Sequence, residues 1–108
     1  MKTRSPRILI IDDDLSNIRL LASIFDSYDN EKYDIFFTAN GKEGVDIAVR
    51  EQPDLILLDI IMPQISGYDI CKQLQLNALT SSIPIVFITA ISDMESEVYG
   101  LNWVHLIL

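Results

Sequence analysis

The sequence predicts a single α/β domain built around a parallel β-sheet. Short apolar runs rich in Ile, Leu and Val alternate along the chain with amphipathic stretches, a pattern typical of βαβ units with right-handed crossovers. Several runs are apolar at consecutive positions, as expected of strands that are covered on both faces. The 108 residues, 49% hydrophobic and 22% charged, suffice for one compact domain and give no sign of disorder.

The predicted elements follow from apolar runs, caps and breakers. In chain order they are a strand at Arg7–Ile11, a helix capped by Asp14 or Ser16 and ending at Ser27, a strand at Tyr33–Ala39, a helix at Lys42–Glu51, a strand at Asp54–Asp59, a helix at Tyr68–Asn77, a strand at Ile83–Thr89, a helix capped by Ser92 or Asp93 and reaching about Asn102, and a fifth strand at Val104–Leu108. In the first helix, the i, i+3, i+4, i+7 spacing predicts one apolar stripe made of Leu15, Ile18, Leu21, Ala22 and Phe25.

Charge and composition narrow the classes of partner. Eight Lys and Arg against sixteen Asp and Glu leave a formal charge of −8, so direct binding to nucleic acid or to an anionic membrane surface is not expected. The excess of acid suits a bound cation or a basic patch on a protein partner. Cys71 is the sole cysteine, and the apolar run at residues 8–11 is too short for a signal-peptide core or a membrane span, so a cytoplasmic location is expected.

Acidic side chains follow the predicted strands where ligands bind in open α/β sheets, outside the carboxyl ends. Asp12, Asp13 and Asp14 end the first strand, Asp59 ends the third, and Thr89 ends the fourth. Neighbouring strands would gather these groups around one small cleft. Each feature alone has an ordinary explanation as a helix cap, a solvated strand end or a β-forming residue. Their arrival at three separate strand ends favours a site.

Crowded carboxylates repel one another unless a cation lies between them. Mg²⁺ fits this need, because it binds one or two carboxylates and keeps water and phosphate oxygens as its other ligands. Such a site could hold a phosphoryl group while Asp59 acts as the nucleophile and forms an acyl phosphate. Thr89 could donate a hydrogen bond to a phosphoryl oxygen.

Four segments, in order, resemble the receiver domain of two-component response regulators. The first, residues 8–14, ends in the acidic triplet; the second, residues 39–44, is a turn reading Ala-Asn-Gly-Lys-Glu-Gly. The third, residues 54–67, carries Asp59 and the spacing Asp-x-x-Met-Pro-x-x-x-Gly, and the fourth, residues 84–90, ends in Thr89-Ala90. The likeness covers residues 7 to about 103.

The resemblance implies a doubly wound, flavodoxin-like sheet of five parallel strands in the order 2-1-3-4-5, within one domain over residues 1–108. It implies that Asp59 accepts a phosphoryl group from a sensor histidine kinase or a phosphotransfer protein, and that the protein is a signalling phosphoprotein and not a conventional enzyme. Asp12, Asp13, Asp59 and the backbone carbonyl of Ile61 would bind Mg²⁺, and Thr89 would be the switch residue. Asp14, just beyond the usual pair, is assigned to capping.

The sequence departs from the family near its carboxyl end. Receivers carry a Lys-Pro pair after the fifth strand and then a final helix, whereas the lysines here are Lys2, Lys32, Lys42 and Lys72. We therefore expect a truncated domain without the last helix, impaired in switching. A lost charge-assisted hydrogen bond of about 1.5–3 kcal/mol corresponds to about ten- to hundredfold slower transfer. An uncovered sheet face or edge would favour a homodimer.

Other interpretations remain to be weighed. A nucleotide hydrolase would need a Gly-x-x-x-x-Gly-Lys-Ser/Thr loop, which the sequence lacks. A haloacid-dehalogenase-type phosphatase would use Asp12 and Asp14 as an Asp-x-Asp pair, with Asp12 as nucleophile. The third interpretation is a receiver fold that serves as an interaction or dimerisation module and does not depend on phosphorylation. A separate expectation is that the apolar side chains of Ile61 and Ile91 shield an acyl phosphate from water.

Overall fold

The computed structural model describes residues 4–27, 32–88 and 105–107 of the chain. Its elements, in order, are β1 (Arg7–Ile11), α1 (Leu15–Ser27), β2 (Asp34–Thr38), α2 (Gly41–Glu51), β3 (Leu55–Asp59), α3 (Gly67–Leu76), β4 (Ile85–Ile88) and β5 (His105–Ile107). No helix within the described residues is long and apolar enough to cross a membrane.

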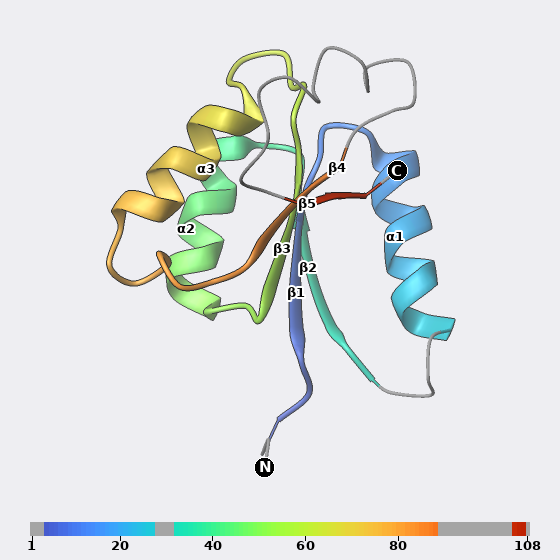
Figure 1. Ribbon diagram of the computed structural model, residues 1–108. Helices are drawn as coiled ribbons and strands as arrows, with labels where there is room; N and C mark the ends of the chain where they lie inside the picture. The colour runs from blue at the N-terminus through green and yellow to red at the C-terminus, as the bar shows by residue number, and fades with distance from the viewer. Residues whose placement is uncertain (1–3, 28–31, 89–104, 108) are drawn as a thin grey trace.

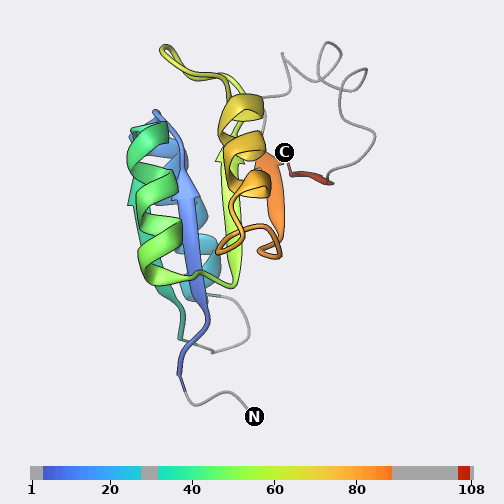
Figure 2. The ribbon, with the colours of Figure 1, turned by 90° about the vertical axis from the view of Figure 1, so that its left-hand side faces the viewer.

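The strands form one parallel sheet in the order β2-β1-β3-β4-β5. Helix α1 covers one face, while α2 and α3 lie together on the other (Figure 1). Figure 2 shows the strands side by side, with β2 at one end of the sheet and β4 and β5 toward the other. The prediction of a parallel α/β sheet wound with helices on both faces is therefore confirmed.

Two apolar layers hold the helices against the sheet. Between the sheet and the α2–α3 face, Leu9, Leu58 and Phe87 are completely buried together with Ile70 and Leu74 of α3. The layer under α1 is smaller, and its buried members are Ile8, Ile10, Ile18, Leu21, Leu57 and Ile88. Consecutive residues of β1 and β3 serve opposite layers, which explains why these strands are apolar at successive positions.

Local signals set the ends of the helices. Asp14 caps α1, since its carboxylate accepts a hydrogen bond of 2.8 Å from the Ser16 N–H. Asn40 caps α2 and Ser66 caps α3, each through its side-chain oxygen. Helix α2 ends at Glu51 and is capped by Gln52, whose φ of 50° is left-handed and whose N–H donates to the carbonyl of Ala48.

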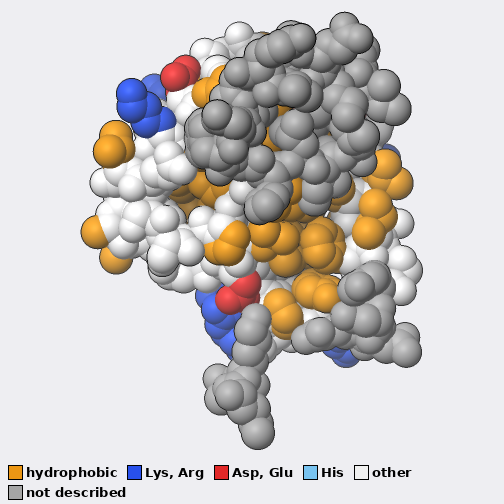
Figure 3. All heavy atoms as spheres, in the orientation of Figure 1, with side chains coloured by type: hydrophobic (Ala, Val, Ile, Leu, Met, Phe, Trp, Pro, Cys, Tyr) orange, Lys and Arg blue, Asp and Glu red, His pale blue; other side chains and the backbone are white. Residues whose placement is uncertain are grey.

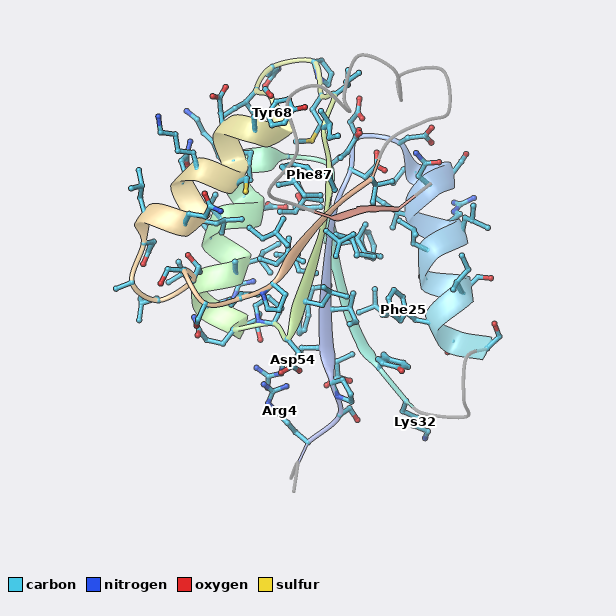
Figure 4. The ribbon with its side chains drawn as sticks, in the orientation of Figure 1. Arg4, Phe25, Lys32, Asp54, Tyr68 and Phe87 are labelled. Carbon is cyan, nitrogen blue, oxygen red and sulfur yellow. The ribbon has the colours of Figure 1, made fainter. Side chains whose placement is uncertain are left out.

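The amino end of the sheet is fastened by polar contacts. The Arg7 N–H donates to the Asp54 carboxylate at 2.8 Å, and the same carboxylate pairs with Arg4 at 3.1 Å. Figure 4 shows Arg4 and Asp54 beside each other below the strands. This fastening lies at the opposite end of the sheet from the acidic triplet.

The predicted elements agree with the observed ones to within two residues at every boundary that falls on described residues. The apolar stripe predicted for α1 is buried only in part. Ile18 and Leu21 are buried, whereas Leu15 is 57% exposed and lines a pocket with Phe37 of β2. The helix predicted from Ser92 or Asp93 to about Asn102 lies outside the described residues.

The loop after β3 folds back tightly at Gly67. Its N–H donates to the Ile60 carbonyl at 2.8 Å, and a Cβ placed on Gly67 would overlap the carbonyl oxygen of Asp59 and come within 2.8 Å of the Ile60 Cα. Because these neighbours are backbone atoms, no change of side-chain rotamer can relieve the overlap. Gly67 therefore sets how closely α3 begins behind Asp59.

We predict that Gly67→Ala lowers the free energy of unfolding by about 1–3 kcal/mol, the usual cost of overpacking. Gly41→Ala is the matched control, because a Cβ there meets the side-chain ends of Ile70 and Ile65 at 2.8 and 2.9 Å, which can move. Urea denaturation monitored by circular dichroism measures both. Equal losses in the two variants would contradict the special role of Gly67.

Candidate functional site

Three carboxylates meet at the carboxyl end of the sheet. Asp12 and Asp13 follow β1, Asp59 is the last residue of β3, and each offers an oxygen lying within 4.8 Å of the others. The pairing of β1 with β3, in which Ile11 lies opposite Leu58, brings these strand ends together. Oxygens at this separation can share one cation.

Asp12 is the buried member of the group. Its side chain is fully buried, and its N–H donates to the Thr38 carbonyl at 3.1 Å, which fixes the backbone against β2. One carboxylate oxygen accepts the Asp14 N–H at 2.9 Å, while the other, Oδ2, accepts no hydrogen bond from any described residue. Burial raises the pKa of Asp12, and the Asp14 N–H offsets part of this rise.

Asp59 is half-buried beside that carboxylate. Burial, as the larger cause, and the charge of Asp12, as the second, raise the pKa of Asp59 from 3.8 to about 8. The Ile61 N–H donates to Asp59 Oδ1 at 3.2 Å and opposes this rise. Asp59 therefore keeps a proton near neutral pH unless another positive charge takes its place.

These observations fit a hard divalent cation. A buried carboxylate oxygen without a described donor is costly, and a cation between the carboxylates would supply its missing partner. The donor set consists of oxygens only, which favours Mg²⁺ or Ca²⁺ over softer metals. Asp12, Asp13 and Asp59 are the residues that could hold such an ion.

A broad open cleft of about 1140 Å³ begins beside Asp13 and runs between the β2–α2 turn and the β3–α3 loop. Its walls carry apolar side chains such as Ile65 and Tyr68, and polar ones such as Lys42 and Asp69. Tyr68 also packs against Phe87 with ring centroids 5.4 Å apart (Figure 4). The cleft gives a partner's side chains access to the acidic group.

The structure brings together some of the residues predicted from sequence. Asp12, Asp13 and Asp59 converge, and Asp14 turns away to cap α1. The Ile61 side chain is 51% exposed at the mouth of the cleft, and its N–H contacts Asp59. Thr89 lies outside the described residues.

Sequence reasoning missed other residues that shape the site. It did not foresee that Thr38 holds Asp12 through its carbonyl, or that Gly67 lies against Asp59. The Ser66-Gly67 pair signalled only a loop. The cleft joins residues that are far apart in sequence, and no local pattern indicates it.

The chain is similar in sequence to known proteins over most of its length. The family model described as the response regulator receiver domain matches residues 8–103. RpaA of Synechocystis, a DNA-binding dual master transcriptional regulator, is 37% identical over 97 residues, covering 90% of this chain and 39% of RpaA. PilH of Pseudomonas aeruginosa is 33% identical over 94 residues, covering 87% of this chain and 75% of PilH. The chain thus spans about two fifths of the length of RpaA.

Solved structures agree in fold. A response regulator of Chloroflexus aurantiacus superposes with a TM-score of 0.82 at 26% identity, covering 97% of this chain and 84% of that one. The receiver domain of the sensor histidine kinase PA1611 from Pseudomonas aeruginosa, solved with magnesium in its active-site cleft, gives 0.77 at 24% identity, covering 96% and 84%. The family model, the relatives and the site together show that this chain belongs to the response regulator receiver domain family.

Proposed function

We propose that Asp59 is the phosphoacceptor of this receiver domain, with residues 1–108 forming a single domain. The observation that carries the proposal is the convergence of Asp12, Asp13 and Asp59, among which Asp12 Oδ2 accepts no hydrogen bond from a described residue. Asp59 is half-buried at the end of β3, whereas Asp12 is fully buried. Asp59 is thus better placed to meet a phosphodonor.

In the proposed reaction an oxygen of Asp59 attacks phosphorus, a P–O bond forms, and the bond from phosphorus to the donor breaks. The donor would be the phosphohistidine of a sensor histidine kinase or a phosphotransfer protein, whose imidazole leaves. The protein is a phosphoacceptor and not a conventional enzyme. Asp12, Asp13, Asp59 and the Ile61 carbonyl would hold Mg²⁺, and Thr89 would contact the phosphoryl group.

Bound Mg²⁺ would neutralise the carboxylates and stabilise charge on the phosphoryl oxygens. The residues of the chain orient the carboxylates. Asp12 is held rigidly by its bonds to Thr38 and Asp14, so its oxygens are oriented before any ligand binds. The Ile61 N–H orients Asp59 Oδ1, and Gly67 keeps the backbone behind Asp59 in place.

We further propose that the 108-residue chain switches poorly by itself. The proposal rests on the lysines of these 108 residues, Lys2, Lys32, Lys42 and Lys72, none of which follows β5. We propose a cytoplasmic protein in which a homodimer could form at an uncovered face or edge. Hydrophobic side chains gather between α3 and α1, where β4 lies (Figure 3). A phosphorylation-independent module is less favoured, because it would not need the carboxylates so close together.

The first prediction concerns the site of labelling. Incubation with Mg²⁺ and a small acyl-phosphate donor such as acetyl phosphate should label Asp59 with a hydroxylamine-sensitive bond, and acetate should leave. Asp59→Asn should abolish the label, whereas Asp14→Asn, which alters only the α1 cap, should keep it. Peptide mapping by mass spectrometry locates the label. Persistent label in Asp59→Asn would refute the assignment, and label on Asp12 would indicate a phosphatase-like site.

The second prediction concerns pH. Because folding raises the pKa of Asp59 to about 8, its contribution to stability is largest below pH 4 and is lost as the pH rises from about 4 to about 8. Without Mg²⁺ at pH 7.5, Asp59→Asn should therefore melt higher than wild type. Asp59 is only half-buried and partly screened, so we expect about 4–8 °C, corresponding to about 1 kcal/mol.

Mg²⁺ should raise the melting temperature of the wild type and have little effect on that of Asp59→Asn. The difference in melting temperature between the two proteins should therefore become smaller or change sign. Thermal melts by circular dichroism at pH 4 and pH 7.5, with and without Mg²⁺, test this. If the two proteins differ equally at both pH values, the proposed strain among the carboxylates is absent.

The third prediction concerns the lifetime of the acyl phosphate. Ile61 exposes half of its apolar side chain at the cleft mouth, two residues beyond Asp59, where it would hinder an attacking water. Ile61→Asn should speed dephosphorylation about tenfold, equivalent to about 1.4 kcal/mol of barrier. Leu76→Asn, exposed at the far end of α3, is the control. Ile91→Glu, at a position outside the described residues, is expected to act like Ile61→Asn, and unchanged rates would exclude shielding.

A further inference from the structure

The outer edge of β2 has the properties of a pairing surface. In the sheet formed by the described strands, β2 is terminal and pairs only with β1 (Figure 2). Its sequence, Asp-Ile-Phe-Phe-Thr, contains neither Pro nor Lys, which commonly protect an edge, and its one charged residue, Asp34, lies at its amino end. Three consecutive β-forming apolar residues therefore occupy an open edge.

Two hydrogen bonds establish which backbone groups of β2 point outward. The Asp34 N–H donates to the Pro6 carbonyl at 2.9 Å, and the Thr38 carbonyl accepts the Asp12 N–H at 3.1 Å. Both contacts lead toward β1. Because backbone direction alternates along a strand, residue 36 also faces β1, whereas the N–H and C=O groups of Ile35 and Phe37 face away from it.

The side chains of the same two residues lie on the α1 side of the sheet. Ile35 and Phe37 line an apolar pocket of about 270 Å³ with Leu15, Ile18 and Ala22. Phe37 is 56% exposed, and Leu15 across from it is 57% exposed. An aromatic side chain in this position leaves apolar surface in water beside unpaired backbone groups.

We propose that a second copy of this chain pairs with β2 in an antiparallel arrangement centred on Phe36. In that register Ile35 of each copy lies opposite Phe37 of the other. All outward N–H and C=O groups of Ile35 and Phe37 then join in hydrogen-bonded pairs. The apolar side chains of Ile35 and Phe37 meet across the strands beside each α1, as in other stabilising cross-strand pairs.

The distribution of charge fits this register. Asp34 lies opposite Thr38 of the second copy, so no like charges face each other within the strands. Lys32, at the amino end of β2 in Figure 4, falls level with Asn40 of the second copy. Asn40 caps α2, and the first turn of that helix carries the acidic Glu43. A twofold axis makes each of these contacts occur twice.

The interface is short, and we expect a weak dimer. A strand of five residues spans about 17 Å, and contacts of this size fall at the low end of specific interfaces. Each copy also carries a formal charge of −8, which opposes association and is screened by salt. Dimerisation should therefore strengthen as the ionic strength rises.

Sedimentation equilibrium of the 108-residue chain between about 10 µM and 1 mM tests the proposal. The average mass should rise from 12.3 kDa toward twice that value, and more steeply in high salt. Phe37→Lys should abolish the rise, whereas Leu79→Lys should not, although Leu79 is equally exposed at 59%. Phosphoryl labelling of Asp59 should survive in Phe37→Lys, so the two proposals can fail separately.

Cysteine cross-linking tests the register and stays informative if Phe37→Lys misfolds. Chains carrying Ile35→Cys mixed with chains carrying Phe37→Cys should form a disulfide, whereas either variant alone should not, because identical residues are too far apart in this register. The native Cys71 is buried and serves as an unreactive background. A concentration-independent monomer, a dimer insensitive to Phe37→Lys, or equal cross-linking in unmixed samples would overturn the proposal.

Discussion

The candidate site depends on carboxylates being held closer together than their charges favour. Asp12 is fully buried, and Asp59 is half-buried beside it. Burial raises the pKa of both carboxyl groups, and the charge of Asp12 raises the pKa of Asp59 further. Only a rigid support can maintain such an arrangement. Here the support is the parallel sheet. Among strands β1 to β4, whose burial the structure describes, β1 and β3 are the most completely buried, and they end at the same level.

That constraint explains why the least adaptable contacts cluster around the site. The Thr38 carbonyl holds the backbone of Asp12, the Asp14 N–H holds one of its carboxylate oxygens, and Gly67 lets α3 begin against the backbone of Asp59. None of these contacts uses a flexible side chain on the supporting partner. A cation or a proton can therefore be exchanged without displacing the strands, as the proposed phosphoacceptor role requires.

Sequence reasoning succeeded where a local pattern carries a physical meaning. Continuous apolar runs located β1 and β3, and caps and breakers located α2 and α3, because burial and backbone hydrogen bonding act over a few residues. The positions of Asp12, Asp13 and Asp59 at strand ends followed from the alternation of strands and helices. Their convergence needed only the assumption that β1 and β3 are neighbours, which the structure bears out.

What the sequence concealed is tertiary. Leu15 has the spacing of a buried residue, yet it is 57% exposed, because periodicity gives a direction around the helix and not how much of the neighbouring surface covers each residue. Asp12 and Asp13 are identical neighbours, but one is fully buried and the other exposed. The contact of Gly67 with Asp59 depends on an angle of chain entry that no single residue type encodes.

Strand β2 connects the site to the edge of the sheet in a way that keeps their roles separate. Its inward N–H and C=O groups form hydrogen bonds with β1 and its flanking residues, and the Thr38 carbonyl accepts the Asp12 N–H. Its outward groups belong to Ile35 and Phe37, whose side chains line the pocket beside α1 and are not part of the group of Asp12, Asp13 and Asp59. Because alternate residues of one strand serve the two purposes, a second copy can occupy the edge without removing any hydrogen bond on which Asp12 depends. Association and phosphoryl transfer can therefore vary independently.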